Sequence, residues 1–200
     1  MNKLFWQTAN RLAQGGYIQE KYIALYAKTM ETLLAICVNF ISALLIGCLF
    51  EMQWHCLLFL AAFIPLRSYA GGYHARGYVS CYLTSCIMLA IMLWVEKHLL
   101  LEGHMTVAVW QLFLVAIPVI FLFAPLADEN KPLSEKEEQI FRRRARMILL
   151  VEAALVPVLA GLKTDYGYSV MLAIIVSALM LVMYKSREYI QSCISTDKGA

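Results

Sequence analysis

Long apolar stretches alternate with short polar connectors along most of the chain. Each apolar stretch is close to the roughly 20 residues that a helix needs to cross a bilayer. The fifth stretch is the weakest, because Glu152 and Pro157 interrupt it. The pattern predicts an all-α polytopic membrane protein with about six transmembrane helices, at 31–50, 54–70, 78–95, 105–126, 147–162 and 168–184.

Two polar segments stand outside this alternation. In residues 1–28, apolar side chains fall close to helical spacing until Gly15–Gly16, which predicts an amphipathic helix lying in the membrane interface. A soluble cap on the helix bundle is the alternative. Residues 127–147 are charged and long enough for a short surface helix, which Ser134 and Glu137 would open as a capping box. We expect one membrane-embedded domain over residues 1–200.

Composition and charge support the membrane assignment and orient the chain. The sequence is 61% hydrophobic and 16% charged, whereas soluble domains are about 45–50% apolar and about 25% charged. With six spans, both termini and the connectors at 66–77 and 127–147 share one side. Every lysine and arginine except Lys97 and Lys163 falls on that side, which makes it cytoplasmic. A lipid bilayer is therefore an expected partner, and nucleic acid is not.

The cysteines do not form a metal or disulfide pattern. No CxxC pair occurs and the spacings are irregular. Cys37, Cys48 and Cys56 lie in or beside apolar runs, where we interpret them as small buried side chains. Cys86 is interpreted as a packing residue. No metal and no other cofactor is expected, and the HExxH pattern of a metalloprotease is absent from the sequence.

His74 and Cys81 carry candidate chemistry between the second and third apolar stretches. A cysteine nucleophile needs a base to form its thiolate, and histidine often serves as that base. In one straight helix seven residues rise about 10.5 Å, which is too far for a hydrogen bond. The glycines at 71, 72 and 77 therefore predict a break at 70–77, with Cys81 in the first turn of the next helix. A polar interfacial His74 and a space-filling Cys81 are the plainer interpretation.

The stretch RSYAGGYHARGYVSC, from Arg67 to Cys81, resembles the signature of the accessory gene regulator B family. That pattern has an arginine, then AGGxHA, then a cysteine seven residues after the histidine. The later APLADENKPLSEKE resembles the short AP…NKPL segment of the same family. Length, basic side and helix layout agree over essentially the whole chain. The resemblance implies a membrane cysteine endopeptidase of bacterial quorum sensing, placed in the cell membrane with a cytoplasmic active site.

The resemblance also implies a substrate and roles for residues. The substrate would be a precursor peptide with an amphipathic leader, a middle segment and a charged C-terminal tail. Cys81 would attack the bond at the tail junction, and His74 would act as base and then as acid. A side-chain thiol or hydroxyl of the substrate would then close a thiolactone or lactone ring. Arg67 and Gly72 match positions that the motif marks as needed for activity. Relatives are thought to act as dimers, and a homodimer is left open here.

Further residues have less support in the sequence. Gly71 is assigned to the break and to positioning the substrate. Asp128, Glu129 or Asn130 would orient His74, and nothing in the sequence chooses among them. Glu152 is expected to face the bundle interior, paired with an arginine from the cytoplasmic side. The basic segment 142–146 would attract an acidic substrate tail or serve only as a topology signal.

A non-enzymatic membrane transporter or peptide exporter is the competing function. Polar residues inside spans and broken helices also mark transport sites. The sequence shows no evident inverted repeat, and its polar residues gather at one interface rather than midway through the spans. These features favour the peptidase.

Overall fold

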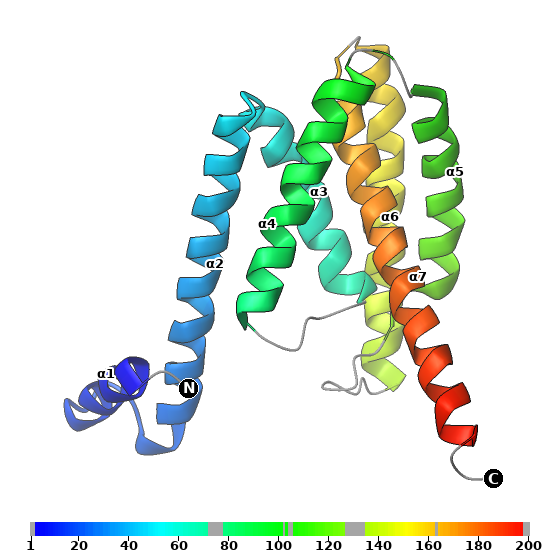
Figure 1. The fold of residues 1–200 in the computed structure, drawn as a ribbon. Coiled ribbons are helices and arrows are strands. Elements are labelled where there is room, and N and C mark those ends of the chain that lie inside the picture. Colours follow the sequence, from blue (N-terminus) through cyan, green and yellow to red (C-terminus); the bar gives the residue numbers. More distant parts are fainter. Residues whose placement is uncertain are drawn as a thin grey trace. The chain divides into compact units, whose positions relative to one another are not determined.

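The computed structural model describes residues 3–71, 78–101, 103, 106–126, 135–162 and 164–197. Within them the chain is helical, apart from turns and one isolated backbone bridge. Figure 1 shows the helices in chain order. Their bounds are α1 Lys3–Gln14, a 3₁₀ turn Glu20–Tyr22, α2 Ile23–Leu49, α3 Gln53–Ala70, α4 Tyr78–Val95, a π-helical segment Glu96–Leu100, α5 Thr106–Phe123, α6 Glu135–Gly161 and α7 Gly167–Asp197.

The six predicted spans correspond to α2 through α7, which confirms the all-α membrane class. Among the residues that the structure describes, four helical stretches are long and apolar enough to cross a membrane. Those four are Glu20–Leu49, Val79–Leu100, Thr106–Phe123 and Gly167–Arg187. The other two helices are less apolar, because α3 carries His55 and Arg67 near its ends and α6 begins with a charged run. That α3 and α6 also cross the membrane therefore remains a prediction.

The chain divides into two compact units, Met1–Leu45 and Ile46–Ala200. The first unit holds α1 and most of α2. The amphipathic pattern predicted for α1 is present, and the helix ends where Gly16 takes a positive φ of 75°. Such a backbone conformation is readily adopted by glycine, which explains why the helix stops at this pair.

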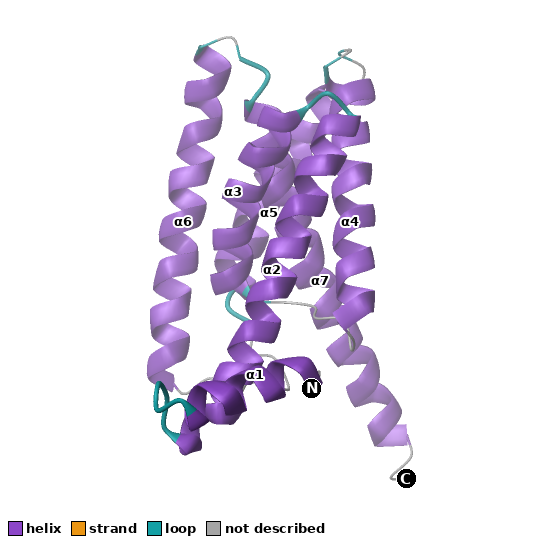
Figure 2. Ribbon diagram, turned by 90° about the vertical axis from the view of Figure 1, so that its left-hand side faces the viewer, coloured by secondary structure: helices purple, strands orange, loops and turns teal. Residues whose placement is uncertain are grey.

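In the second unit α7 is the central helix. It packs against α3, α5 and α6, and 61% of its apolar stretch is buried, against 11 to 22% for the other three candidate spans. The surrounding helices each bury one face at a spacing of three or four residues, such as Val109, Phe113, Ala116 and Ile120 on α5. Figure 2 shows α3 to α7 of this unit running roughly parallel or antiparallel to one another.

One predicted boundary is wrong. The sequence predicts a surface helix within 127–147 followed by a separate span at 147–162, whereas α6 runs unbroken from Glu135 to Gly161. The helix begins directly after Ser134, where the capping box places its start. Nothing between Glu135 and Met147 breaks a helix, since the charged run holds neither glycine nor proline. The charged turns therefore extend the span itself.

A buried hydrogen bond joins the π-helical segment to α7. Glu96 is 1% exposed, and the hydroxyl of Ser169 donates to its Oε1 at 2.7 Å. The next residue, Lys97, donates from Nζ to the carbonyl of Phe50 at 2.8 Å. Both bonds lie at the end of the bundle where α2 is followed by α3. They connect the segment after α4 to α7 and to the turn between α2 and α3.

Replacing Ser169 with alanine should destabilise the second unit. The substitution leaves the Glu96 carboxyl buried without its donor, which costs about 1–3 kcal/mol. The measurement is the unfolding midpoint of the purified chain in mixed detergent micelles. Ser186→Ala is the matched control, because Ser186 is exposed on the same helix and bonds only to the carbonyl of Val182. Equal losses in the two variants would contradict a structural role for the Glu96–Ser169 bond.

Candidate active site

Cys81 lies in the first turn of α4, as the sequence predicts. The helix begins at Tyr78, and the thiol of Cys81 is free and exposed. The start of α4 and the end of α3 lie at the same end of the bundle (Figure 1). Cys86 follows on the same helix with a half-buried side chain. Thus α3 ends at Ala70, a new helix begins at Tyr78, and Cys81 is open to a reactant in the first turn of that helix.

Gly71 ends α3 in a conformation that other residues adopt only with strain. Its φ is 76° and its ψ is −158°, and its amide still bonds to the carbonyl of Arg67 at 3.3 Å. A Cβ at this position would lie 2.2 Å from the carbonyl oxygen of Leu126. Glycine is therefore required twice, by its backbone angles and by the close approach of a second backbone.

The second backbone belongs to the segment that follows α5. Gly71 and Leu126 form an isolated parallel bridge, and the amide of Leu126 donates to the carbonyl of Ala70 at 3.0 Å. Leu126 stands in the APL sequence at 124–126, and Gly71 opens the Gly-Gly pair. Two short sequences some fifty positions apart thus meet through their main chains.

Arg67 acts on the same short stretch. From the last turn of α3 its Nη1 donates to the carbonyl of Gly71, four residues along the chain. Leu66 and Ala70 on the neighbouring turns are fully buried. The guanidinium group therefore holds the backbone where the chain leaves the helix. This contact positions the backbone at the end of α3, and a role of Arg67 in the reaction stays a prediction.

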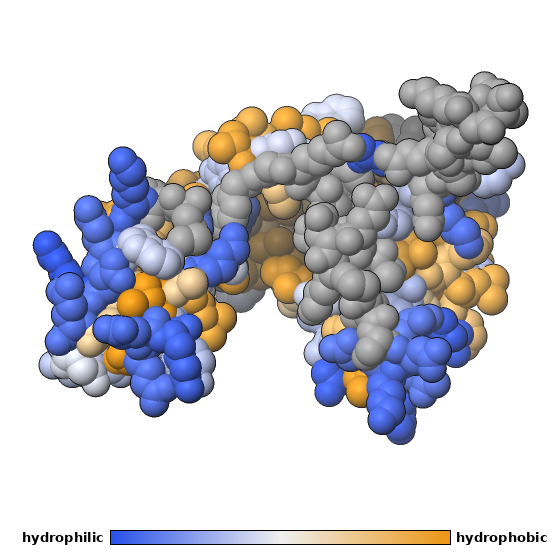
Figure 3. All heavy atoms as spheres, turned by 90° about the horizontal axis from the view of Figure 1, so that it is seen from below, coloured by the Kyte–Doolittle hydropathy of each residue, from blue (hydrophilic) through white to orange (hydrophobic). Residues whose placement is uncertain are grey.

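Arginines of the basic segment 142–146 bind other parts of the bundle. Arg144 donates from Nη1 to the hydroxyl of Tyr69 at 3.2 Å, and the Tyr69 ring packs 5.6 Å from that of Phe141. Arg146 donates to the carbonyl of Phe121 from two nitrogens, at 3.2 and 3.3 Å. These contacts connect α6 with the ends of α3 and α5. Figure 3 views this end from below and shows hydrophilic side chains gathered on its right.

Several predicted site residues lie outside the described part of the chain. These are His74, Gly72, Asp128, Glu129 and Asn130. The pairing of His74 with Cys81 and the choice of a residue that orients His74 therefore stay predictions.

Glu152 faces the bundle interior, as predicted, but the expected arginine partner is wrong. The residue is 7% exposed, and its Oε2 has no hydrogen-bond partner within the described ranges. Its helical position explains the outcome, because Ala145, Leu149 and Val156 share the buried face of α6 while the arginines near them turn to other carbonyls and rings.

Two cysteine assignments are also corrected. Cys56 is buried, as predicted, and a Cβ on Gly47 would come within 3.0 Å of its Cβ at the corner between α2 and α3. Cys37 and Cys48 are exposed within their own units instead. Both lie on α2, most of whose apolar side chains are exposed.

Sequence reasoning missed the polar group at the opposite end of the bundle. There the ring of His55 lies 4.8 Å from the ring of Tyr166. Tyr166 is three residues before Ser169, whose hydroxyl bonds to Glu96 and joins the π-helical segment to α7. The stretch WVEKHLL contains a signal for this group, because a carboxyl at the end of an apolar run is costly to bury unless it has a hydrogen-bonding partner. The partner was hidden because Ser169 is remote in sequence.

Comparison with known proteins gives a consistent family. The family model for accessory gene regulator B matches residues 7–184. A putative AgrB-like protein of Clostridium perfringens is 25% identical over 153 residues, covering 74% of this chain and 72% of its own. Accessory gene regulator protein B of Staphylococcus aureus is 28% identical over 129 residues, covering 64% and 65%. No solved structure matches the chain.

Gly71→Ala should destabilise the bundle and release Leu126. The new Cβ overlaps the carbonyl of Leu126, and it also disfavours the positive φ at this position. The unfavourable φ alone costs about 1–2 kcal/mol. Gly103→Ala is the matched control, because Gly103 has a φ of 82° with nothing within 4 Å of its Cβ position. The measurements are the unfolding midpoint and hydrogen exchange of the Leu126 amide. If Gly71→Ala costs no more than Gly103→Ala, the bridge does not constrain the end of α3.

Proposed function

The chain belongs to the accessory gene regulator B family, and on this premise we propose that it is a membrane cysteine endopeptidase of quorum sensing. Its substrate is a short precursor peptide, from which it removes the C-terminal tail. The same active site then closes the remaining peptide into a thiolactone or lactone ring. The observation that carries the proposal is an exposed, free thiol at the first turn of α4, beside the break after Gly71.

The position of Cys81 suits a nucleophile. The start of a helix carries the positive end of its dipole, which favours the negative charge of a thiolate. The thiol is also exposed, so a peptide carbonyl can approach it. Cys56, by contrast, is fully buried and cannot meet a substrate.

The reaction proceeds in two transfers at one sulfur. His74 takes the proton of Cys81, and the thiolate attacks the carbonyl at the tail junction. His74 then protonates the leaving amine, and the tail departs with an acyl-thioester left on Cys81. A thiol or hydroxyl side chain of the substrate attacks that thioester, closes the ring and returns the thiol of Cys81. The captive nucleophile competes well with water because it is held near the carbonyl.

The bridge brings together the points where two connectors begin. It holds Gly71 against Leu126, so the connector that carries His74 and the connector that carries Asp128 and Asn130 depart from adjacent points. Arg67 fixes the carbonyl of Gly71 at the same place. A residue that orients His74 can therefore come from the second connector, which is the role we propose for Asp128 or Asn130.

A non-enzymatic transporter is the second candidate. Buried carboxyls inside a bundle mark transport pathways in membrane proteins, and Glu96 and Glu152 are both buried. Such a function would place no demand on the thiol of Cys81. The two candidates are therefore separated by single substitutions at that residue.

Replacing Cys81 or His74 with alanine should abolish processing of the precursor. The test co-expresses each variant with a candidate precursor peptide that has an amphipathic leader, an internal cysteine or serine and a charged tail, and follows peptide mass. Cys86→Ala is the matched control, since Cys86 is a second thiol on the same helix. We expect loss of both tail and ring products with Cys81→Ala and His74→Ala, and processing close to that of the unmodified chain with Cys86→Ala.

Cys81→Ser gives a second reading of the same mechanism. A serine hydroxyl is a far weaker nucleophile at neutral pH than a thiol, so processing should slow strongly while the variant still folds. Processing that continues at the normal rate in Cys81→Ala or in His74→Ala would exclude the thiol mechanism. A covalent adduct between chain and precursor that is labile to hydroxylamine would identify the acyl-thioester.

A further inference from the structure

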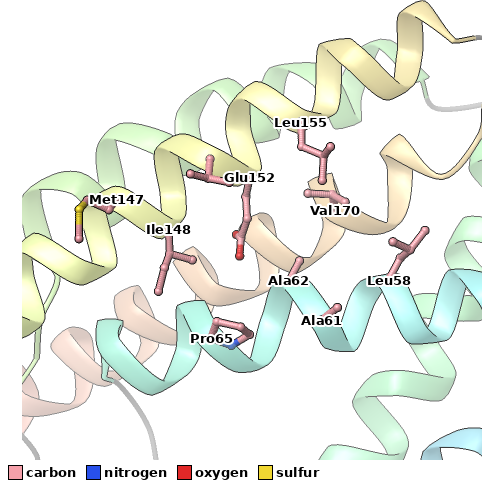
Figure 4. A pocket seen from close by; sticks show the side chains of 10 residues that line it. Leu58, Ala61, Ala62, Pro65, Met147, Ile148, Glu152, Leu155 and Val170 are labelled. Carbon is pink, nitrogen blue, oxygen red and sulfur yellow. The ribbon is translucent and has the colours of Figure 1, made fainter.

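A pocket of about 350 Å³ lies between α3, α6 and α7, away from Cys81 in sequence and not used by the proposed reaction. Its lining is apolar except for one group, the carboxyl of Glu152. Figure 4 shows that carboxyl pointing from α6 toward Ala62 and Pro65 of α3. The remaining wall residues are Leu58, Ala61, Met147, Ile148, Val151, Leu155 and Val170.

The Glu152 carboxyl is buried, and one of its oxygens lacks a hydrogen-bond donor within the described residues. Only 7% of the residue's surface is exposed, and Oε2 has no hydrogen-bond partner in the part of the chain that the structure describes. Leaving a buried polar group without a partner is expensive, and the cost is greater for a carboxylate. A ligand that brings a donor into the pocket recovers this cost, so the pocket favours a positively charged or amide-bearing group.

The lining of the pocket suits contact with a second helix. Its wall follows α3 from Leu58 to Pro65 and α6 from Met147 to Leu155, which is about 10–12 Å along each helix. Ala62 forms part of the α3 wall, and small residues let a second helix approach closely within a membrane. Met147, Val151 and Leu155 are exposed at the other side, so the pocket opens sideways from the bundle.

The depth of Glu152 suits a helix lying in the interface. The residue follows Met147, the first residue of the apolar part of α6, by about 7.5 Å of helix rise. An interfacial amphipathic helix buries its apolar face by about 5–10 Å. A lysine or arginine on such a helix can lay its apolar stem along the lining and reach the carboxyl with its terminal nitrogen.

We propose that this pocket binds a basic side chain of an amphipathic peptide helix that lies in the membrane interface. If the peptidase function holds, the amphipathic leader of the precursor is the peptide that occupies it, and that identification rests on the proposed function. The pocket would then hold the leader on α3 and α6, the helices that carry Arg67 and Arg144. The binding site itself requires no chemistry at Cys81.

The test is photocrosslinking of the full chain, carrying Cys81→Ala, in phosphatidylcholine nanodiscs. Benzoylphenylalanine replaces Ala61, an exposed residue of the pocket wall, and Leu114 on α5 is the matched exposed position outside it. The probe is a synthetic amphipathic helix of leucine and lysine, and its control has glutamine in place of lysine. Adduct at position 61 is divided by adduct at position 114, which cancels ordinary partitioning into the lipid.

The lysine probe should give a ratio about tenfold above that of the glutamine probe, since a charge-assisted hydrogen bond is worth at least one decade in affinity. Glu152→Gln should lower the ratio, and Glu152→Leu, which has no acceptor and a similar volume, should remove the preference for lysine. Equal ratios for the two probes, or a preference that survives in Glu152→Leu, would overturn the proposal. Adducts at position 61 made only with lipid, or only with a second copy of the chain, would overturn it too.

The outcome is independent of the processing test. Because every crosslinking variant carries Cys81→Ala, binding is measured where no peptide can be cleaved. Failure of the pocket therefore leaves the thiol mechanism standing. Loss of the thiol mechanism removes only the identification of the leader as the bound peptide, and the preference of the pocket for a basic helix is still measured.

Discussion

The structure depends on one constraint, which is that polar groups inside an apolar bundle need partners within the protein. Glu96 takes its partner from Ser169, and Lys97 caps the carbonyl of Phe50. Arg146 covers the carbonyl of Phe121. These contacts join helices that apolar packing alone holds weakly in lipid. Within the described residues His55 Nε2 and Glu152 Oε2 are the exceptions to this constraint, and the position of Glu152 at the wall of a pocket makes it informative.

The apolar pattern predicts the helices well because each depends on local sequence. Apolar runs long enough to span, and the glycines after α1 and α3, are visible in any single stretch. The prediction of a separate surface helix before the fifth span was wrong, because it also relied on local sequence alone. The charged turns before Met147 look like a surface helix, yet nothing breaks the helix between them and the apolar turns. Polarity marks a change of environment, and it does not by itself mark the end of a helix.

The arrangement of the helices could not be predicted in the same way. That α7 is central, with its residues buried on several sides, follows from how four helices pack together. The partner of Gly71 is likewise remote, since Leu126 lies beyond two further helices. Backbone pairing leaves no mark on the side-chain pattern that sequence reasoning uses. The prediction of an arginine partner for Glu152 was wrong for a similar reason. The sequence shows how many charged residues fall on one side of the membrane, but it does not show which side chains contact each other.

The bridge changes the explanation for the first glycine of the Gly-Gly pair. From the sequence, Gly71 serves a bend that brings His74 toward Cys81. In the structure its positive φ ends α3, and its missing Cβ admits the carbonyl of Leu126. A residue needed for a bend alone would tolerate alanine wherever the backbone angles allowed it, whereas contact with a second backbone forbids any side chain. The glycine is thus constrained by the segment after α5, and the connector that carries His74 begins at that contact.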